Sequence, residues 1–304
     1  MKKISQHSKK SSYNRDTNIQ YFHVEKNDTL LNFLFQTFPE KSKTTVKSYL
    51  SHKQVAVNKT VCSQFDHPLQ PGDSVAVNFD RNFSELKHPM LKLVYEDDYF
   101  VVVNKANGLL TVATDLEKNK TAFRIVSDYV KSQHPRNHIF VLHRLDKDTS
   151  GLLVFAKSPE IQSEMQRNWE RAVTDRKYVA VIEGRPEKMS GELTSYLCEN
   201  KAFKVYSSPT NQGQFARTRY QIIKAGKQYS LVELELGTGR KNQIRVHMSE
   251  IGHSIAGDKK YGAKSNPIKR IALHAFKLAF IHPITKEELS FSTPIPKSFQ
   301  ALVG

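Results

Sequence analysis

The sequence predicts an α+β fold with a mixed, largely antiparallel sheet, preceded by a small N-terminal α/β domain. Strand-like and helix-like segments follow one another without the regular strand–helix–strand alternation that builds a parallel sheet. The chain has 304 residues, which is long for one average domain and enough for two domains with a buried core.

The N-terminal part divides into a basic arm and a compact segment. Residues 1–20 are basic and Ser-rich and contain no apolar run, so we expect a disordered arm and not a secretory signal. Residues 21–80 contain apolar residues at helical spacing, a second short helix and alternating strand segments, at 30–38, 46–50, 54–58 and 74–79. Lys43, Lys47 and Lys53 lie close to these elements. They fit either a nucleic-acid-binding module or the solvated face of a helix.

Residues 81–90 are polar and irregular and form the expected linker to a second domain, 91–304. We expect helices over 121–130 and from Ser158-Pro159, a serine N-cap followed by proline at the first helical position. Ile161, Met165 and Trp169 give the second helix its apolar stripe. The expected strands are 93–95, 100–103, 152–156, 178–182, 217–223 and 231–236.

The charge balance points to a polyanionic partner. The chain carries 46 Lys and Arg against 30 Asp and Glu, a formal net charge of +16. Each phosphate that a Lys or Arg neutralises releases condensed counterions. Nucleic acid and an anionic membrane both satisfy this condition, and a basic, solvated surface is the alternative. No stretch approaches the roughly 20 apolar residues of a membrane span.

The two cysteines, Cys62 and Cys198, lie far apart and have no partner at metal-ligand spacing. We therefore expect no zinc site, and free thiols in a reducing cytoplasm.

The stretch VLHRLDKDTSGLLVFAK, residues 141–157, places a charged loop directly before an apolar strand. A carboxylate at such a strand end is partly desolvated, which raises its pKa unless a cation holds it ionised. Asp146 is then a candidate nucleophile or base. A structural ion pair between Asp146 and Arg144 is the alternative, and spacing alone favours it.

Two further stretches carry candidate residues. In GTGRKNQIRVHMSEIG, residues 237–252, Arg245 borders an apolar helical face and needs an anion, either Asp146 or a ligand phosphate. The Gly-x-Gly does not have dinucleotide-binding spacing. His247 and His253 have no further ligand at metal spacing. Tyr178 opens an expected strand beside cations, where packing is favoured over stacking on a base.

Together these motifs resemble the RluA-type family of RNA pseudouridine synthases. The resemblance rests on HRLDKDTSG, RKYVAVIEG, TGRKNQIRVH and LHA, and on NKANGLL, where Ala106 replaces the usual proline. It covers about residues 91–304. The N-terminal segment resembles an S4 RNA-binding domain through TTVKSYLSHKQVAVNKTV and PGDSVAV, with Lys53 and Lys59 where glycine is common.

The resemblance implies a role for each matched residue. Asp146 would be the catalytic aspartate, Tyr178 the tyrosine that packs on the target base, and Arg245 the arginine paired with the aspartate. Arg144 would help to displace the target nucleotide. The other candidates for RNA binding are His143, Lys105, Arg240, Lys43, Lys47 and Lys53.

The implied reaction is isomerisation of uridine to pseudouridine in structured RNA, after the uridine is flipped out. It implies no metal, nucleotide or redox cofactor. Large-subunit ribosomal RNA is the favoured partner and transfer RNA the second. We also expect a cytoplasmic monomer without a membrane partner.

Two other classes of protein compete with this interpretation. One is a non-catalytic RNA-binding or ribosome-assembly factor that keeps the fold. The other is a glycoside hydrolase with Asp146 and Asp148 as its acid and base, which requires carboxyls about 5–9 Å apart across a sugar.

Overall fold

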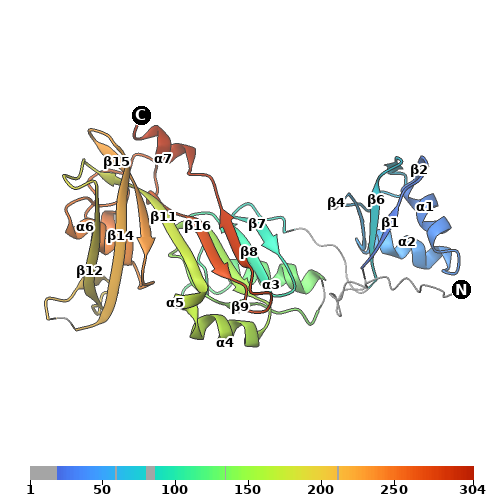
Figure 1. The fold of residues 1–304 in the computed structure, drawn as a ribbon, viewed down its shortest axis with the longest axis horizontal. Helices are drawn as coiled ribbons and strands as arrows, with labels where there is room; N and C mark the ends of the chain where they lie inside the picture. Colours follow the sequence, from blue (N-terminus) through green and yellow to red (C-terminus); the bar gives the residue numbers. More distant parts are fainter. Residues whose placement is uncertain (1–18, 59, 80–85, 134, 211) are drawn as a thin grey trace, which may run out of the picture. The chain divides into compact units, whose positions relative to one another are not determined.

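The computed structural model describes residues 19–58, 60–79, 86–133, 135–210 and 212–304 (Figure 1). The described chain divides into two units. One contains the described residues up to Phe79 together with Tyr129–Asn137, and the other contains Leu86–Asp128 and His138–Gly304. Residues 1–18 of the expected arm and residues 81–85 of the expected linker lie outside the described residues.

The N-terminal unit is a small sheet with two helices and a short second ribbon. The sheet has the order β1 (Ile19–His23), β6 (Ser74–Asn78), β3 (Val55–Val57) and β4 (Thr60–Val61). The remaining elements are β2 (Asp28–Thr29), α1 (Leu30–Thr37), α2 (Lys43–Ser51) and β5 (Pro68–Leu69). The sequence predicted both helices and the strands β3 and β6.

Apolar spacing explains why this unit folds. Leu30 and Leu34 on α1 and Val46 on α2 are fully buried and pack in one cluster with Val55 and Val77 of the sheet. The Ser42 hydroxyl caps α2 by accepting a hydrogen bond from the backbone N–H of Thr45, at 3.1 Å.

One boundary in this unit was placed too late. Ile19 and Gln20, assigned to the arm, lie in β1 and pair with Asn78 and Val77 of β6. Tyr21 and Gln20 are exposed on this edge strand, so the segment carries little apolar signal of its own.

The C-terminal unit is built on one 11-stranded sheet (Figure 1). Its main path runs β13-β12-β14-β15-β11-β16-β10-β8-β7, with β17 on β16 and β9 on β10. The strands are β7 (Leu91–Glu96), β8 (Phe100–Lys105), β9 (Phe140–Val141), β10 (Ser150–Ala156), β11 (Val173–Glu183), β12 (Ser190–Glu199), β13 (Val205–Ser207), β14 (Gln214–Ala225), β15 (Tyr229–Leu236), β16 (Leu273–Ile281) and β17 (Glu288–Ser292).

The predicted antiparallel character is confirmed. The pairs between described strands of this sheet are antiparallel, except that β10 and β16 run parallel through Ser150↔His274 and Gly151↔Ala275. This short parallel contact joins the part of the sheet from β13 to β16 to the part from β10 to β7.

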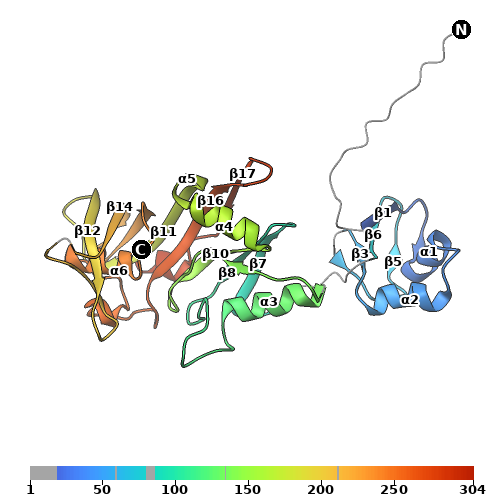
Figure 2. The ribbon, with the colours of Figure 1, turned by 90° about the horizontal axis from the view of Figure 1, so that it is seen from below.

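Six helical segments accompany the sheet: α3 (Ala122–Gln133), α4 (Pro159–Arg167), α5 (Trp169–Ala172), α6 (Gln243–Glu250), the 3-10 turn η1 (Lys259–Tyr261) and α7 (Lys297–Ala301), counted over the described residues. In both views α6 lies beside β12 and β14, at the end of the sheet away from α3 (Figures 1 and 2). The Ser158 hydroxyl accepts from the N–H of Ile161 at 3.2 Å, which confirms the predicted cap of α4.

Three details differ from the sequence-based prediction. The stripe of Ile161, Met165 and Trp169 belongs to two helices, because α4 ends before Asn168 and Trp169 begins α5. Tyr178 lies inside β11, which already begins at Val173. The strands β9, β12, β13, β16 and β17 were not predicted, and in the structure each of them pairs with a neighbouring strand of the sheet.

Candidate active site

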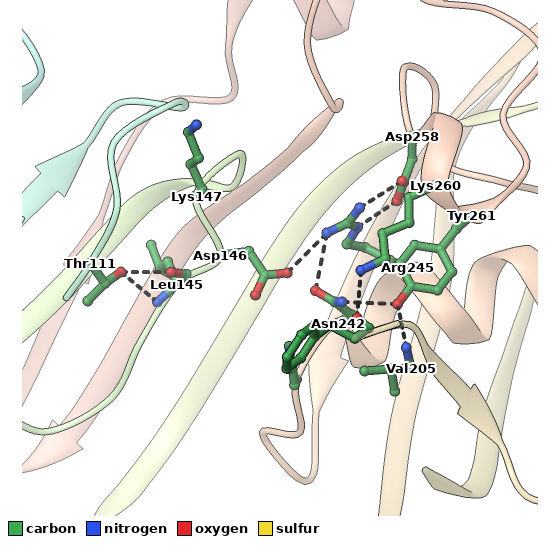
Figure 3. A network of polar contacts seen from close by, with 12 residues as sticks. Thr111, Leu145, Asp146, Lys147, Val205, Asn242, Arg245, Asp258, Lys260 and Tyr261 are labelled. Carbon is green, nitrogen blue, oxygen red and sulfur yellow. Dashed lines mark hydrogen bonds and ion pairs between the residues drawn. The ribbon is translucent and has the colours of Figure 1, made fainter. Parts of the chain in front are cut away.

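Asp146 lies on the loop between β9 and β10, and the backbone on either side of it is fixed. The Thr111 hydroxyl donates to the Leu145 carbonyl at 2.7 Å and accepts from the Leu145 N–H at 3.1 Å (Figure 3). On the other side, the Gly108 N–H donates to the Lys147 carbonyl at 2.8 Å. These bonds leave the Asp146 carboxylate pointing across to Arg245 (Figure 3).

Lys105 also serves this loop. It ends β8, is fully buried, and its Nζ donates to the carbonyls of Leu109 at 2.8 Å, Ala106 at 3.0 Å and Lys147 at 3.2 Å. Burial lowers the pKa of the Lys105 ammonium to about 8, and the nearby carboxylates of Asp148 and Asp146 oppose that shift. The prediction that Lys105 binds RNA is therefore wrong: its ammonium group is enclosed by protein carbonyls.

Arg245 on α6 faces Asp146 but is held mainly by a different acid. Its Nε and Nη2 form a bidentate pair with the two oxygens of Asp258, at 2.6 and 2.8 Å. Its Nη1 donates to Asn242 Oδ1 at 3.1 Å and lies 3.6 Å from Asp146 Oδ2. Both Arg245 and Asp258 are buried, so each charge is compensated only by the other groups of this network.

A second layer holds the arginine in place (Figure 3). The Tyr261 ring lies 4.8 Å from the Arg245 guanidinium carbon, within the range of a cation–π contact. The Tyr261 hydroxyl accepts from Asn242 Nδ2 at 3.0 Å and from the Val205 N–H at 3.2 Å. Asn242, at the N-terminus of α6, adopts a left-handed backbone with φ of 53°, which asparagine tolerates better than most residues.

The electrostatics of Asp146 result from opposing effects. Burial raises the pKa of the Asp146 carboxyl above its usual range, while the charges of Arg245 and Lys105 oppose the rise. The side chain still keeps 32% of its exposure, toward the cleft. Arg245 acts in the predicted direction, but burial is the larger effect.

The carboxylate opens into a cleft of about 1700 Å³ in the C-terminal unit. Among the described residues that line it, nine are Arg or Lys and four are Asp or Glu. A cleft with this excess of positive charge attracts a polyanion such as an RNA backbone.

Tyr178 of β11 also lines this cleft and is 5% exposed. Arg176 Nη2 donates to the Tyr178 hydroxyl at 3.4 Å, and the Arg176 guanidinium carbon lies 6.0 Å from the centre of its ring. The predicted packing of Tyr178 and its place in the site are thus compatible.

Arg144, Arg240 and His143 lie in the same lining. Arg144 and Arg240 are exposed, which leaves their guanidinium groups accessible. His143 Nε2 accepts from the Val154 N–H at 3.2 Å, and its ring lies 5.4 Å from Trp169. Burial lowers the pKa of His143 to about 3, so the ring is neutral and fixes the loop against β10.

The structure thus brings together Asp146, Tyr178, Arg245, Arg144, Arg240 and His143 in one cleft. Lys43, Lys47 and Lys53 belong to the other unit and are exposed there. Lys53 has a φ of 56°, a left-handed backbone that explains why glycine suits this position. Lys59 lies outside the described residues. The ion pair that the structure shows for Asp146 is with Arg245, and not with Arg144.

Comparison with known proteins shows the family to which this chain belongs. A family model described as RNA pseudouridylate synthase matches residues 99–250, which contain Asp146, Tyr178 and Arg245. The chain belongs to the RluA-type RNA pseudouridine synthases. This pseudouridine synthase is 32% identical over 286 residues to the RNA pseudouridine synthase YlyB of Bacillus subtilis, covering 92% of this chain and 94% of that one.

Two further relatives are also named as pseudouridine or pseudouridylate synthases. The synthase is 29% identical to ribosomal large subunit pseudouridine synthase D of Escherichia coli K12, over 89% of this chain and 88% of the relative. The solved structure of human RNA pseudouridylate synthase domain containing 4 matches with a TM-score of 0.56 and 25% identity, covering 68% of this chain and 90% of that one. The enzyme therefore isomerises uridine in RNA to pseudouridine.

Sequence reasoning missed Asp258 and Tyr261 of the synthase. They lie three residues apart between Gly257 and Gly262, and an acid and an aromatic bracketed by two glycines is the one local signal. A Cβ at Gly257 would lie 2.2 Å from the Arg270 carbonyl oxygen, so this turn approaches other backbone closely.

His247 and His253 make hydrogen bonds that hold the fold together. His247 bonds to the hydroxyls of Thr218 at 2.9 Å and Ser195 at 3.0 Å, and His253 Nδ1 donates to the Glu183 carbonyl at 2.8 Å. No group of three or more His, Cys, Asp and Glu in the described parts could hold a metal ion. Within the same residues, no helix is long and apolar enough to cross a membrane.

Proposed function

We propose that this synthase modifies a specific uridine of large-subunit ribosomal RNA, with Asp146 as the catalytic carboxylate. The main support is the position of the Asp146 carboxylate in the cationic cleft, 3.6 Å from Arg245. The buried Asp258 holds Arg245 in place. Relatives named ribosomal large subunit pseudouridine synthase D support this choice of RNA. Transfer RNA is the second candidate target.

The uridine must leave its stack before the carboxylate can reach it. Flipping a nucleotide costs a few kcal/mol of stacking and pairing energy. Arg144 is exposed at the cleft, on the same loop as Asp146, and takes the place of the displaced nucleotide in this proposal. The Tyr178 ring, held by the strand β11, packs on the flipped uracil.

The reaction breaks the bond from ribose to uracil N1 and forms a bond from ribose to uracil C5. Asp146 attacks the base or the sugar, or removes a sugar proton. Each of these roles requires an ionised carboxylate. Arg245 favours the ionised form, and Asp258 keeps Arg245 in position when Asp146 changes its charge. The proton lost from C5 returns to N1, so that substrate and product are isomers.

The test is a complementation experiment on the enzyme in cells. Total RNA from cells lacking the gene, carrying either the wild type or Asp146→Asn, is mapped by carbodiimide labelling and primer extension. We expect wild-type complementation to restore one or a few marks in large-subunit ribosomal RNA and Asp146→Asn to restore none. The matched control is Asp128→Asn, an exposed aspartate paired with Arg124, which should behave as the wild type.

Stability separates loss of chemistry from loss of folding. Burial raises the pKa of Asp146, so the ionised form costs folding free energy above that pKa and the cost disappears as the pH falls. Asp146→Asn should therefore not lower the melting temperature at neutral pH. Marks restored by Asp146→Asn would refute the catalytic role, and marks lost only from transfer RNA would overturn the proposed target.

A further inference from the structure

A pair of aromatic side chains, Tyr196 and Phe215, adjoins two residues that line the cleft, Arg217 and Arg240, although neither aromatic residue lines it. Tyr196 of β12 and Phe215 of β14 are directly opposite each other in the antiparallel register. Their ring centroids are 5.6 Å apart with an interplanar angle of 63°. Phe215, the second residue of β14, is 42% exposed, which is high for a phenylalanine.

This pair lies on the face of the sheet away from α6. The alternate residues of β14, Ala216 and Thr218, are fully buried, and Thr218 bonds to His247 and Gln243 of α6. Side chains of a strand alternate between the two faces of a sheet. Phe215 and Arg217 therefore point to the opposite face, where Phe215 is partly exposed.

Two cations connect the aromatic pair to the cleft. Arg217 is two residues from Phe215 on the same face and lines the cleft. A Cβ at Gly237 would lie 2.5 Å from Arg217 Nε, so the guanidinium packs closely over this glycine. Arg240, another lining residue, donates from Nε to the Phe215 carbonyl at 3.0 Å.

Charge pairing changes along the strand. Among the described residues, neither Arg217 nor Arg240 takes part in an ion pair, whereas Arg219 on the next rung pairs with Glu192 at 2.7 Å and with Glu235 at 3.8 Å. The arginines without an ion pair, Arg217 and Arg240, thus lie beside the aromatic pair and line the cleft. Further along β14, the charge of Arg219 is compensated by two glutamates.

We propose that Tyr196, Phe215, Arg217 and Arg240, here called the aromatic platform, bind a nucleotide that flanks the target uridine in the RNA chain. Its base stacks on Phe215 and Tyr196, and its phosphate lies against Arg217 or Arg240. An aromatic surface beside cations binds single-stranded RNA without strong sequence preference, because every base has a stackable face. The inference rests on the RNA substrate of the proposed function and extends its binding site out of the cleft.

A structural role for the pair is the competing explanation, because cross-strand aromatic pairs also stabilise sheets. The two roles predict different results for substitution of Phe215. Loss of a stacking surface weakens RNA binding at unchanged folding, and removal of a packing partner in the sheet lowers stability without a specific effect on RNA.

The experiment measures binding of a fluorescein-labelled 12-residue oligouridylate to the full chain by fluorescence anisotropy. Removing one base–aromatic stack costs about 5-fold to 150-fold in affinity. We expect Phe215→Ala to raise Kd within this range and Phe215→Tyr to keep the wild-type value. The control is Ile223→Ala on the same strand, where the side chain is 49% exposed and lies eight residues along β14 from Phe215.

Activity on a tritiated large-subunit ribosomal RNA transcript separates this inference from the proposed function. Phe215→Ala should raise KM and leave kcat close to the wild type. A wild type that binds the oligomer but releases no tritium from the transcript would refute the proposed target and leave the platform standing. Binding by Phe215→Ala equal to the wild type would overturn the platform, as would a wild type that does not bind the oligomer. A change of oligomeric state in Phe215→Ala with unchanged RNA binding would show a protein contact instead.

Discussion

Arg245 is the residue on which the site depends, because it contacts two carboxylates with different tasks. Asp258 is 1% exposed and forms the bidentate pair, while Asp146 is partly exposed and lies at a longer distance. Asp258 therefore fixes the arginine, and the arginine's Nη1 faces the Asp146 carboxylate. The sequence named Asp146 and a phosphate as candidate partners of Arg245 and missed the principal one.

The Arg245 charge should control the acid side of the pH–rate profile. In the proposed mechanism activity requires ionised Asp146, so we expect activity to fall as the pH drops through the pKa of Asp146. Burial raises this pKa, and the charge of Arg245 opposes the rise. We expect Arg245→Gln to move this fall in activity to higher pH. Single-turnover tritium release from labelled RNA, measured across the acid range, shows the shift.

Arg245→Gln also leaves the buried Asp258 carboxylate without its partner, at a cost of roughly 3–5 kcal/mol in the free energy of unfolding. Arg245→Lys keeps a positive charge and should return the acid limb toward the wild-type pH, although it loses the bidentate geometry. A folded Arg245→Gln enzyme with the acid limb of the wild type would contradict this account.

At the scale of elements, the contact between β10 and β16 positions the loop that carries Asp146. β10 follows Asp146 by four residues, and its first two residues form the parallel contact with β16. Ser150 also accepts from Arg270 Nη2 at 2.8 Å and bonds to His274 Nδ1 at 2.8 Å. The loop that carries Asp146 thus leads directly into β10, the strand at which the two parts of the sheet join.

Gly151 makes this junction possible. Its φ is 119°, and a Cβ there would lie 2.1 Å from the Ala275 carbonyl oxygen and 2.6 Å from the Ala275 nitrogen. We expect Gly151→Ala to separate β10 from β16, to lower the free energy of unfolding by more than about 2 kcal/mol, and to abolish activity. Chemical denaturation and tritium release measure the two effects.

Gly252 provides the matched control. It also has a left-handed backbone, with φ of 81°, but a Cβ there meets no atom within 4 Å. Gly252→Ala should cost only the backbone strain, about 1–2 kcal/mol, and keep activity. Equal losses in the two variants would mean that the close approach at Gly151 is not what matters.

At the scale of the whole molecule, positive charge occurs in both units. The C-terminal unit holds the cationic cleft, and the N-terminal unit carries exposed lysines on and beside α2. The resemblance of the N-terminal unit to an S4 domain predicts that these lysines contact RNA phosphates. Its two helices and small sheet fit that prediction.

Replacing Lys43 and Lys47 together by glutamine should weaken RNA binding and flatten its salt dependence. The slope of log K against log salt is negative. Each lysine that no longer neutralises a phosphate reduces the magnitude of this slope by about 0.7–0.9, so the loss of two lysines should reduce it by about 1.4–1.8. Binding titrations of a ribosomal RNA transcript at several salt concentrations give the slope. Lys224→Gln with Lys227→Gln, two exposed lysines of the C-terminal unit, is the control. A slope unchanged by the first pair would exclude α2 as a phosphate-binding element.

The sequence by itself determined the local features of this protein. The string HRLDKDTSG indicated the family and named Asp146 as a candidate, because these residues form one continuous loop and strand. Ser158-Pro159 predicted the start of α4, since a cap depends on neighbours three residues apart. The antiparallel character followed from the irregular order of strands and helices.

The tertiary structure decided what depends on distant packing. Asp146 meets Arg245, 99 residues away, only because β16 joins β10 to β11. Asp258 becomes the partner of Arg245 because a tight glycine turn carries it under α6, and Lys105 is enclosed because two loops close over its ammonium group. Charge and motif are written in the local sequence, whereas burial and pairing arise from contacts between segments far apart in the chain.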